Sequence, residues 1–372
     1  MKSIKKWSFT QVMVFGFLAL ILVGACILML PICNANGKWL NFPDALFTSC
    51  TCVCVTGLVT VVPAFQFTFL GKLVMLFLIQ VGGWGVIVCV TYVLVLMKVK
   101  LTIQERVMLQ NYFNRDSMRG LVGILQYVVK GSLVVEGIGA LGYACRFIPQ
   151  FGLLRGIWYA VFHSISAFCN AGFDLLGKTD HLYPSLTSYV GNPLVNLTIM
   201  GLIVTGGIGF LTWDDIYTKK YHFRQYCMQS KVILLTSLFL IFVPAAFFFF
   251  RDFAGMPVKE RTLCALFQSV TTRTAGFNTA DLSGMTGASQ AIMIILMMIG
   301  GAPGSTAGGM KITTFAVLTA NASATFRQRE DTQMFGRRVG QEVLKNASTI
   351  LMMYLFLVLM GGMVISVAEN LP

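Results

Sequence analysis

The chain has 372 residues, of which 56% are hydrophobic and only 12% are charged, and its formal net charge is +13. This composition excludes an ordinary soluble domain and is typical of a polytopic membrane protein. The basic balance raises nucleic-acid binding as an alternative, which would require the charges to share one soluble face. Instead, Lys and Arg gather in four polar segments separated by apolar runs, at residues 2–6, 98–119, 219–231 and 327–345.

Seven apolar runs are each long enough to cross a hydrocarbon core of about 30 Å. The basic segments fall on alternate connections between these runs, which is the positive-inside pattern and places the N-terminus in the cytoplasm. The first run follows a basic start and so resembles a signal peptide, but its length of about 20 residues suits an uncleaved span. The predicted spans cover residues 12–32, 72–97, 121–144, 191–213, 232–250, 288–319 and 347–367.

Three shorter stretches lie between spans, on the outer side of this topology. Each mixes aromatic residues with Ser, Thr and Cys, and each is too short or too polar to cross the membrane alone. Irregular backbone at membrane depth is tolerated only where protein buries it or water lines it. We therefore expect three re-entrant half-helices, each followed by a loop. The predicted half-helices cover residues 43–54, 152–169 and 257–272, and each runs into a glycine turn, at 55–58, 170–173 and 274–277.

The glycine in each turn suits a loop that lines an ion path. Several loops that meet on one axis can replace the water shell of a cation with backbone carbonyl oxygens. Glycine has no Cβ and accepts positive φ, so it lets successive carbonyls turn inward and another backbone approach closely. A tight turn between two spans is the alternative for any single loop, and the threefold repetition argues against it.

The unit of span, half-helix, loop and span therefore repeats along the chain. A second glycine cluster follows each loop, at 82–85, at 206–209 and from 300 onward, and the first two indicate close helix packing rather than an ion role. A fourth unit begins with the seventh span, and its half-helix, loop and last span are missing, which predicts a truncated chain or an incomplete pore. We expect repeat 1 at 1–97, repeat 2 at 98–213, repeat 3 with its glycine-rich loop at 214–324, and a cytoplasmic linker plus the first span of repeat 4 at 325–372.

The pore-loop sequences resemble those of a known family of transporters. Residues 162–173, Phe-His-Ser-Ile-Ser-Ala-Phe-Cys-Asn-Ala-Gly-Phe, are similar to the second pore loop of the Trk/Ktr/HKT superfamily of potassium transporters. Residues 267–279 resemble its third pore loop, and residues 55–58 match the first. The resemblance covers essentially the whole chain, and it is to the bacterial membrane subunits of the TrkH and KtrB type, apparently truncated before the fourth pore loop.

This resemblance implies an all-α polytopic membrane protein whose repeated helix–pore loop–helix units surround a central ion pore. In the family, serine in place of the first filter glycine accompanies sodium preference, so Gly57 favours potassium. The resemblance also implies the bacterial cytoplasmic (inner) membrane, a homodimer and a cytosolic nucleotide-binding regulatory subunit of the RCK type. The implied filter residues are Val55, Thr56, Gly57, Leu58, Cys169, Asn170, Ala171, Gly172, Phe173, Thr274, Ala275, Gly276 and Phe277, with Arg273 beside them.

A glycine-rich segment interrupts the sixth span, and no helix runs undisturbed through this density of glycine with a proline. By resemblance it is an intramembrane gating loop beneath the filter. A nucleotide-binding P-loop is excluded because that pattern ends in Gly-Lys-Ser/Thr, whereas Met310 precedes Lys311 and Ile312 follows it. A plain kink without gating stays an alternative. The implied gate residues are Gly300, Gly301, Gly304, Ser305, Thr306, Gly308, Gly309 and Lys311.

Three ionisable residues lie close to these elements. Glu136 is the one acidic residue well inside a span, and it is either functional or one half of a structural pair. Arg273 would repel a cation if it pointed inward, so we expect it to point away and to brace the loop through an acidic or carbonyl partner. We expect structural hydrogen bonding, rather than metal binding, from His163.

No enzyme constellation is present, because the three histidines are scattered and neither a paired Cys-x-x-Cys pattern nor a nucleophile elbow occurs. The sequence predicts a potassium uptake protein that is not an enzyme, with potassium as its substrate, no organic cofactor and no nucleic-acid partner. Two alternatives stay open. One is a sodium-conducting or sodium–potassium coupled transporter, and the other is a non-conducting, truncated membrane subunit.

Overall fold

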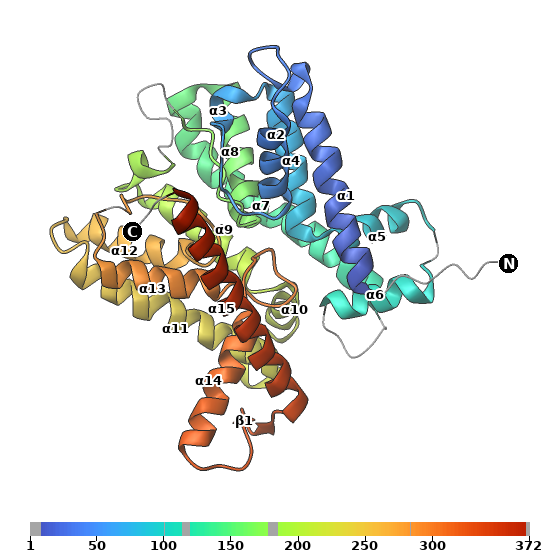
Figure 1. The fold of residues 1–372 in the computed structure, drawn as a ribbon, viewed down its shortest axis with the longest axis vertical. Coiled ribbons are helices and arrows are strands. Elements are labelled where there is room, and N and C mark those ends of the chain that lie inside the picture. The colour runs from blue at the N-terminus through green and yellow to red at the C-terminus, as the bar shows by residue number, and fades with distance from the viewer. Residues whose placement is uncertain (1–8, 100, 114–119, 178–184, 283, 370–372) are drawn as a thin grey trace.

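The computed structural model describes residues 9–99, 101–113, 120–177, 185–282 and 284–369, which form an almost entirely helical protein (Figure 1). Within these residues, four helices are individually long and apolar enough to cross a membrane. The number rises to six spans if each of two sharply bent helix pairs counts as one. The expected all-α polytopic fold is thereby confirmed. The basic residues at 2–6, which contribute to the predicted orientation of the N-terminus, lie outside the described residues.

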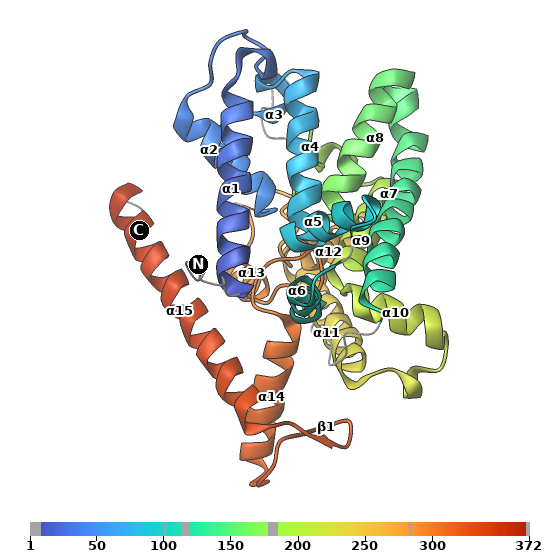
Figure 2. The same ribbon diagram turned by 90° about the vertical axis from the view of Figure 1, so that its right-hand side faces the viewer.

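The first repeat places a half-helix between two spanning segments. Helices α1 and α4 run side by side in both views, and α2 packs against each of them (Figures 1 and 2). Proline in the first turn of α2 fixes where this helix begins, because the first turn needs no amide donor. The elements are α1 (Phe9–Met29), η1 (Pro31–Cys33), α2 (Phe42–Val53), α3 (Pro63–Gln66), α4 (Phe69–Trp84) and α5 (Val86–Leu96).

The second repeat uses the same plan, with α7 and α8 as its antiparallel span and half-helix. These two helices share one of the most extensive contacts in the protein, and both pack against α9. The predicted half-helix at 152–169 is observed as α8, within one residue at each end. The elements are α6 (Ile103–Phe113), α7 (Leu121–Phe151), α8 (Leu153–Phe168), η2 (Thr187–Tyr189), α9 (Pro193–Gly207) and α10 (Phe210–Lys219).

The third repeat pairs α11 with its half-helix α12, just as α1 pairs with α2 and α7 with α8. Its last span is divided into α13 and α14 by the glycine-rich segment. Beyond α14 the chain forms a small hairpin away from the bundle and returns as α15 (Figure 2). The elements are η3 (Phe223–Gln225), α11 (Met228–Arg251), α12 (Val258–Thr271), α13 (Gly287–Met298), α14 (Ile312–Phe326), β1 (Gln333–Met334), β2 (Arg337–Arg338) and α15 (Gln341–Glu369).

The second and fourth predicted spans are broken, which the sequence analysis did not predict. Helices α4 and α5 meet at 97° around Gly85, and α9 and α10 meet at 97° around Gly209. The two glycines have nearly the same backbone, with φ of 86° and 85° and ψ of 140° and 143°. Only glycine adopts this conformation readily. Hydropathy predicts one span for each pair because the apolar residues continue through the break, and hydropathy does not report a change in the direction of the helix axis.

Two of the three half-helices, α8 and α12, are anchored by a buried phenylalanine. Phe162 of α8 and Phe267 of α12 occupy corresponding positions and are both fully buried, whereas Phe47 of α2 is 39% exposed. The largest cluster of buried side chains joins the first two repeats, and a second cluster joins α11, α12, α13 and the start of α14. Most of α15 is exposed in this chain, and its spanning part has no buried residue. The core therefore lies around the three half-helices and fixes where their C-terminal ends meet.

We predict that Gly82→Ala destabilises the protein by about 1–3 kcal/mol, as overpacking of a filled site does. A Cβ at this position would lie 2.2 Å from the carbonyl oxygen of Val53, at the end of α2. The matched control is Gly361→Ala in α15, where a Cβ would meet nothing within 4 Å. The measurement is the melting temperature of the detergent-purified protein. An equal change in the two variants would contradict the close packing at Gly82.

Candidate functional site

The three half-helices end in loops that share an unusual backbone conformation. The glycines that the sequence assigns to the filter, Gly57, Gly172 and Gly276, have φ of 79°, 71° and 81°. Two residues earlier, the non-glycine residues Val55, Asn170 and Thr274 also have positive φ, of 51°, 58° and 68°. Positive φ is rare outside glycine, above all for a β-branched residue such as Val55 or Thr274. The same strained pair of positions in three separate loops shows that the loops are one structural element used three times.

A hydroxyl from each half-helix holds the residue that follows the filter glycine. Ser166 Oγ donates to the Phe173 carbonyl at 2.8 Å, and Thr271 Oγ1 donates to the Phe277 carbonyl at 2.6 Å. In the first repeat, Thr51 Oγ1 accepts a hydrogen bond from the Leu58 amide at 3.0 Å. Sequence reasoning missed these residues. The signal for them was a hydroxyl five or six residues before each filter glycine.

The three loops meet directly at their glycines. A Cβ on Gly57 would lie 2.5 Å from the Ala171 carbonyl oxygen, and one on Gly172 would lie 2.6 Å from the Ala275 carbonyl oxygen. A Cβ on Gly276 would lie 3.4 Å from Gly172 Cα and 3.5 Å from the Thr56 carbonyl oxygen. Backbone carbonyls of all three loops therefore converge on one place. The structure brings together the three loops that the sequence assigned to the filter.

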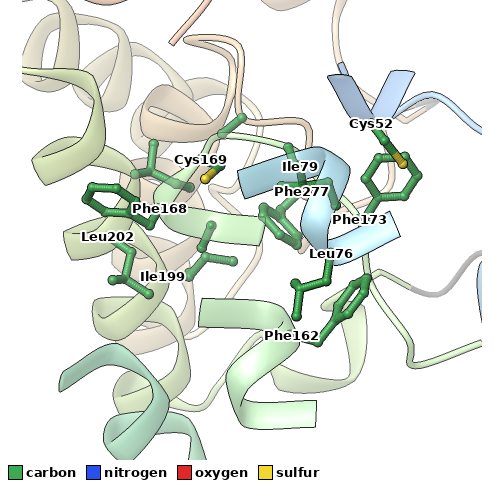
Figure 3. Packing of buried hydrophobic residues seen from close by; sticks show 14 of the residues in the cluster. Cys52, Leu76, Ile79, Phe162, Phe168, Cys169, Phe173, Ile199, Leu202 and Phe277 are labelled. Atoms are coloured by element: carbon green, nitrogen blue, oxygen red, sulfur yellow. The ribbon is translucent and has the colours of Figure 1, made fainter. Parts of the chain in front are cut away.

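Apolar side chains support two of the loops from behind. Cys169, Phe173 and Phe277 are buried, with at most 1% of each side chain exposed. Figure 3 shows Phe173 and Phe277 near Ile79 of α4, with Cys169 close to Phe168. Leu58, at the corresponding position in the first loop, is 61% exposed. The first loop is thus supported less fully by the described residues than the other two.

The glycine loop, residues 300–311, is a compact hydrogen-bonded turn between α13 and α14. The Gly300 amide donates to the Met310 carbonyl at 2.9 Å, and the Gly301 amide donates to the Gly308 carbonyl at 3.3 Å. Lys311 Nζ donates to the Ala307 carbonyl at 2.8 Å and closes the base of the loop. Glycine is required at Gly300, where a Cβ would lie only 1.8 Å from the Gly308 carbonyl oxygen. The segment is therefore an ordered loop with its own backbone bonds rather than a simple kink.

The break between α9 and α10 holds the glycine loop in place. The Ala302 amide donates to the Gly207 carbonyl at 2.9 Å, and the Thr306 amide donates to the Gly206 carbonyl at 3.2 Å. In return, the Phe210 amide at the start of α10 donates to the Gly304 carbonyl at 2.8 Å. The second glycine cluster was predicted to serve close packing alone. The cluster at 206–209 does pack closely, and the carbonyls of Gly206 and Gly207 also accept the hydrogen bonds that hold the glycine loop.

Two further hydrogen bonds tie the glycine loop to the filter loops. Thr306 Oγ1 donates to the carbonyl of Phe168, the last residue of α8, at 2.8 Å. Thr274 Oγ1, in the third filter loop, accepts from the Gly308 amide at 3.2 Å. Both partners lie at the end of the filter where the half-helices stop. The glycine loop and the filter are therefore in direct contact.

The three ionisable residues near the site fall into different environments. Glu136, 4% exposed in α7, accepts a hydrogen bond from Gln80 Nε2 of α4 at 2.8 Å, which is the structural pairing that was one of its two predicted roles. His163 Nδ1 donates to the Tyr159 carbonyl at 2.7 Å, and its Nε2 accepts from the Leu175 amide at 3.4 Å. This bonding fits the expected structural role of His163.

The expected brace from Arg273 is not observed. Arg273 is 7% exposed, and its Nε has no hydrogen-bond partner among the residues that the structure describes. No ion pair or hydrogen bond of its guanidinium occurs in this part of the chain. The acidic or carbonyl partner that the sequence led us to expect is not found among the described residues. Sequence spacing could not show this.

A small cavity lies at the opposite end of the filter from the glycine loop. Its volume is about 40 Å³, and Asp174 lines it together with Gly57 and Gly172. Asp174 Oδ1 accepts a hydrogen bond from the Leu176 amide at 2.9 Å. Burial raises the pKa of the Asp174 carboxyl above its usual value, and the Leu176 hydrogen bond lowers it in part. Asp174 thus places an acidic group at the mouth of the converging loops, and no motif in the sequence pointed to it.

Membrane-spanning helices, re-entrant half-helices and converging carbonyl loops define a polytopic membrane protein of the cation-transporter class. The model of the TrkH family, described as cation transport proteins, matches residues 10–371, and the chain belongs to this family. The family consists of transporters rather than enzymes, in agreement with the sequence prediction. A membrane location is likewise confirmed.

Similar proteins include named uptake proteins. The chain is 35% identical over 374 residues to the potassium/sodium uptake protein NtpJ of Enterococcus hirae, covering 99% of this chain and 81% of that protein. It is 34% identical over 379 residues to the Ktr system potassium uptake protein B of Bacillus subtilis, covering 100% and 83%. The crystal structure of the potassium transporter TrkH from Vibrio parahaemolyticus has the same fold, with a TM-score of 0.70 at 18% identity over 94% of this chain and 69% of that one.

We predict that Thr271→Val destabilises the third filter loop by about 1–3 kcal/mol, because the Phe277 carbonyl loses its buried donor. Thr262→Val is the matched control, since Thr262 lies on the exposed part of α12 and its hydroxyl donates to the Val258 carbonyl of its own helix. The melting temperature of the purified protein measures the difference. Equal melting temperatures for the two variants would show that the Thr271 hydroxyl does not hold the loop.

Proposed function

We propose that this protein carries potassium across the membrane through a path lined by backbone carbonyls of the three glycine loops. The observation that carries the proposal is the contact between Gly57, Gly172 and Gly276, where a Cβ on Gly57 or Gly172 would overlap a carbonyl oxygen of the neighbouring loop. Carbonyl oxygens gathered in this way replace the hydration shell of a cation. The named potassium uptake relatives and the family membership support potassium as the transported ion.

The half-helices add to the attraction for a cation. Helices α2, α8 and α12 all direct their C-terminal ends toward the convergence of the loops. A helix C-terminus carries a partial negative charge of about half an elementary charge. Three such ends stabilise a cation there without placing a carboxylate in the path. A cation can therefore be held and released, which conduction requires.

The glycine loop is the proposed gate. It is hydrogen-bonded against the inner end of the filter, so an ion that leaves the filter meets it next. Its density of glycine gives it backbone freedom that a continuous helix lacks. A plain kink explains a change of direction, but it does not explain hydrogen bonds to the end of the half-helix α8 and to the third filter loop. Gating requires this loop to move away from the filter when a partner on the cytosolic side acts on the protein.

Several finer points belong to this proposal. We place the protein in the bacterial cytoplasmic (inner) membrane with its N-terminus in the cytoplasm, because the basic segments alternate as the positive-inside rule requires. Family resemblance supports a homodimer and a cytosolic nucleotide-binding subunit of the RCK type. The repeat boundaries at 1–97, 98–213, 214–324 and 325–372 follow from the same topology. Sodium, which one similar protein carries in its name, is the alternative or coupled ion.

We predict that Gly172→Ser lowers the ratio of rubidium to sodium uptake at least several-fold. The added Cβ would lie 2.6 Å from the Ala275 carbonyl oxygen, and the loop must shift its carbonyls. Gly201→Ser is the control, because a Cβ at Gly201 in α9 meets nothing within 4 Å. The assay is uptake by cells that lack their own potassium uptake and express the full-length protein.

The outcomes of this experiment separate the alternatives. Wild-type protein that carries sodium with no preference for rubidium would establish the sodium transporter. Membrane-inserted protein that carries neither ion would establish a non-conducting subunit. A ratio unchanged by Gly172→Ser would remove Gly172 from the filter.

We predict that Asp174→Asn lowers rubidium uptake at limiting rubidium concentrations, because the mouth loses the negative charge that attracts cations. Burial raises the pKa of the Asp174 carboxyl, so wild-type uptake should fall on acidification at a higher pH than an exposed aspartate would cause. The Asn variant should lose this part of the pH dependence. Asp44→Asn, at the start of α2, is the control for a lost acidic charge. Identical pH profiles of wild-type and Asp174→Asn protein would refute the role of Asp174.

A further inference from the structure

The glycine loop donates hydrogen bonds to two oxygen atoms at the inner end of the filter. The last carbonyls of any helix have no partner within the helix. At the end of α8, the carbonyls of Ile165, Ser166 and Ala167 accept bonds from the filter-loop amides, and the carbonyl of Phe168 accepts instead from the Thr306 hydroxyl. In the third loop, the Thr274 hydroxyl accepts from the Gly308 amide. One of these oxygens lies at the end of the half-helix α8 and the other lies in the third filter loop, and both of their partners belong to the glycine loop.

A third polar group lies beside them without a partner. Asn170 is 1% exposed, and neither Oδ1 nor Nδ2 of its side chain has a hydrogen-bond partner among the described residues. A Cβ on Gly207 would lie 3.8 Å from Asn170 Nδ2, and the Gly207 carbonyl is where the glycine loop binds. Asn170 and Thr274 occupy corresponding positions in their loops. A buried amide with both atoms unbonded costs free energy, so its presence calls for an explanation.

We propose that these groups form a cation-binding position which the docked glycine loop masks. The Phe168 carbonyl, the Thr274 hydroxyl and the Asn170 amide oxygen would face the ion path when the loop withdraws. A monovalent cation that leaves the filter would be held there by neutral oxygens and by the C-terminal end of α8. Withdrawal of the glycine loop would then open the ion path and would also free these oxygens to bind the ion at the innermost position. This inference rests on the proposed function in cation transport.

The close approach of the glycine loop has its own structural requirement. A Cβ on Gly206 would lie 2.1 Å from the Phe168 carbonyl oxygen and 2.7 Å from Thr306 Oγ1. Glycine at this position is what lets the Thr306 hydroxyl reach the end of α8. In the first repeat, Gly82 packs in the same way against the carbonyl of Val53, at the end of α2. There the described residues supply no hydroxyl from another loop to that carbonyl. The masking contact is therefore specific to the side where the glycine loop docks.

Substitutions at Thr306 and Thr274 test the proposal because they separate masking from binding. Thr306→Val removes only the mask, so uptake without an activating partner should rise about threefold or more, and the half-saturating rubidium concentration should stay unchanged. Thr274→Val removes an oxygen of the binding position. It should raise the half-saturating rubidium concentration about fivefold, the factor that corresponds to one hydrogen bond. Thr306→Ser and Thr274→Ser keep the hydroxyl and should restore wild-type behaviour.

Ser305→Ala is the matched control within the same loop. Among the described residues, the Ser305 hydroxyl bonds only to the Ala302 carbonyl and the Ala307 amide, so its loss loosens the glycine loop without removing a bond to the filter loops. This variant should change the amount of uptake but neither the half-saturating concentration nor the rubidium-to-sodium ratio. Melting temperatures of the purified proteins identify folded variants, and Thr274→Ala replaces Thr274→Val if the latter does not fold.

Each result bears on the proposal in a defined way. A shift in half-saturation for Thr274→Val and not for Thr306→Val or Ser305→Ala supports the masked binding position. Unchanged half-saturation in Thr274→Val and Thr274→Ala overturns it while leaving the proposed transport function intact. Thr306→Val with unchanged resting uptake overturns the mask. Absence of rubidium uptake by wild-type protein that is present in the membrane refutes the transport function itself.

Discussion

Close contact between backbone segments at the centre of the molecule is the constraint on which the rest of the structure depends. Gly57 and Gly172 lie so close to the neighbouring loops that there is no room for a Cβ, and Gly276 lies in van der Waals contact with the other two loops. Carbonyl groups can surround a small ion only if the chains that carry them come this near. Everything around the loops serves to hold them there: the buried half-helices, their hydroxyl braces and the phenylalanines behind them.

The same constraint recurs one layer further from the axis. Gly82 and Gly206 lie against the last carbonyls of α2 and α8, where a Cβ would be 2.2 Å and 2.1 Å from the oxygen. These contacts set the height of each half-helix against the following span. A half-helix that shifts along the membrane normal moves its filter loop with it. The second glycine clusters therefore act on the ion path indirectly, through the position of the half-helix ends.

The sequence predicted the half-helices well because their signals are local. Aromatic, Ser and Thr residues before a glycine turn located α2, α8 and α12 within about a residue or two. The breaks at Gly85 and Gly209 escaped notice because apolar residues continue on both sides of them. Other features depend on which segments of the chain meet in space. These are the hydrogen bonds of the Ser166 and Thr271 hydroxyls and the lack of a partner for Arg273 among the described residues. Such contacts require the fold, and a single sequence shows them only as repeated residue types.

The glycine loop is best understood as the third-repeat version of a break that all three repeats share. In the first two repeats, a single glycine with φ near 85° divides the span into two helices at 97°. In the third, the break widens into residues 300–311, and the extra length reaches the ends of two filter loops. A break is tolerated at this depth because surrounding protein satisfies the backbone groups it releases. Because only the third repeat has the longer break, only this repeat supplies a loop that contacts the ends of the half-helices, and the proposed gate therefore lies on one side of the three converging loops.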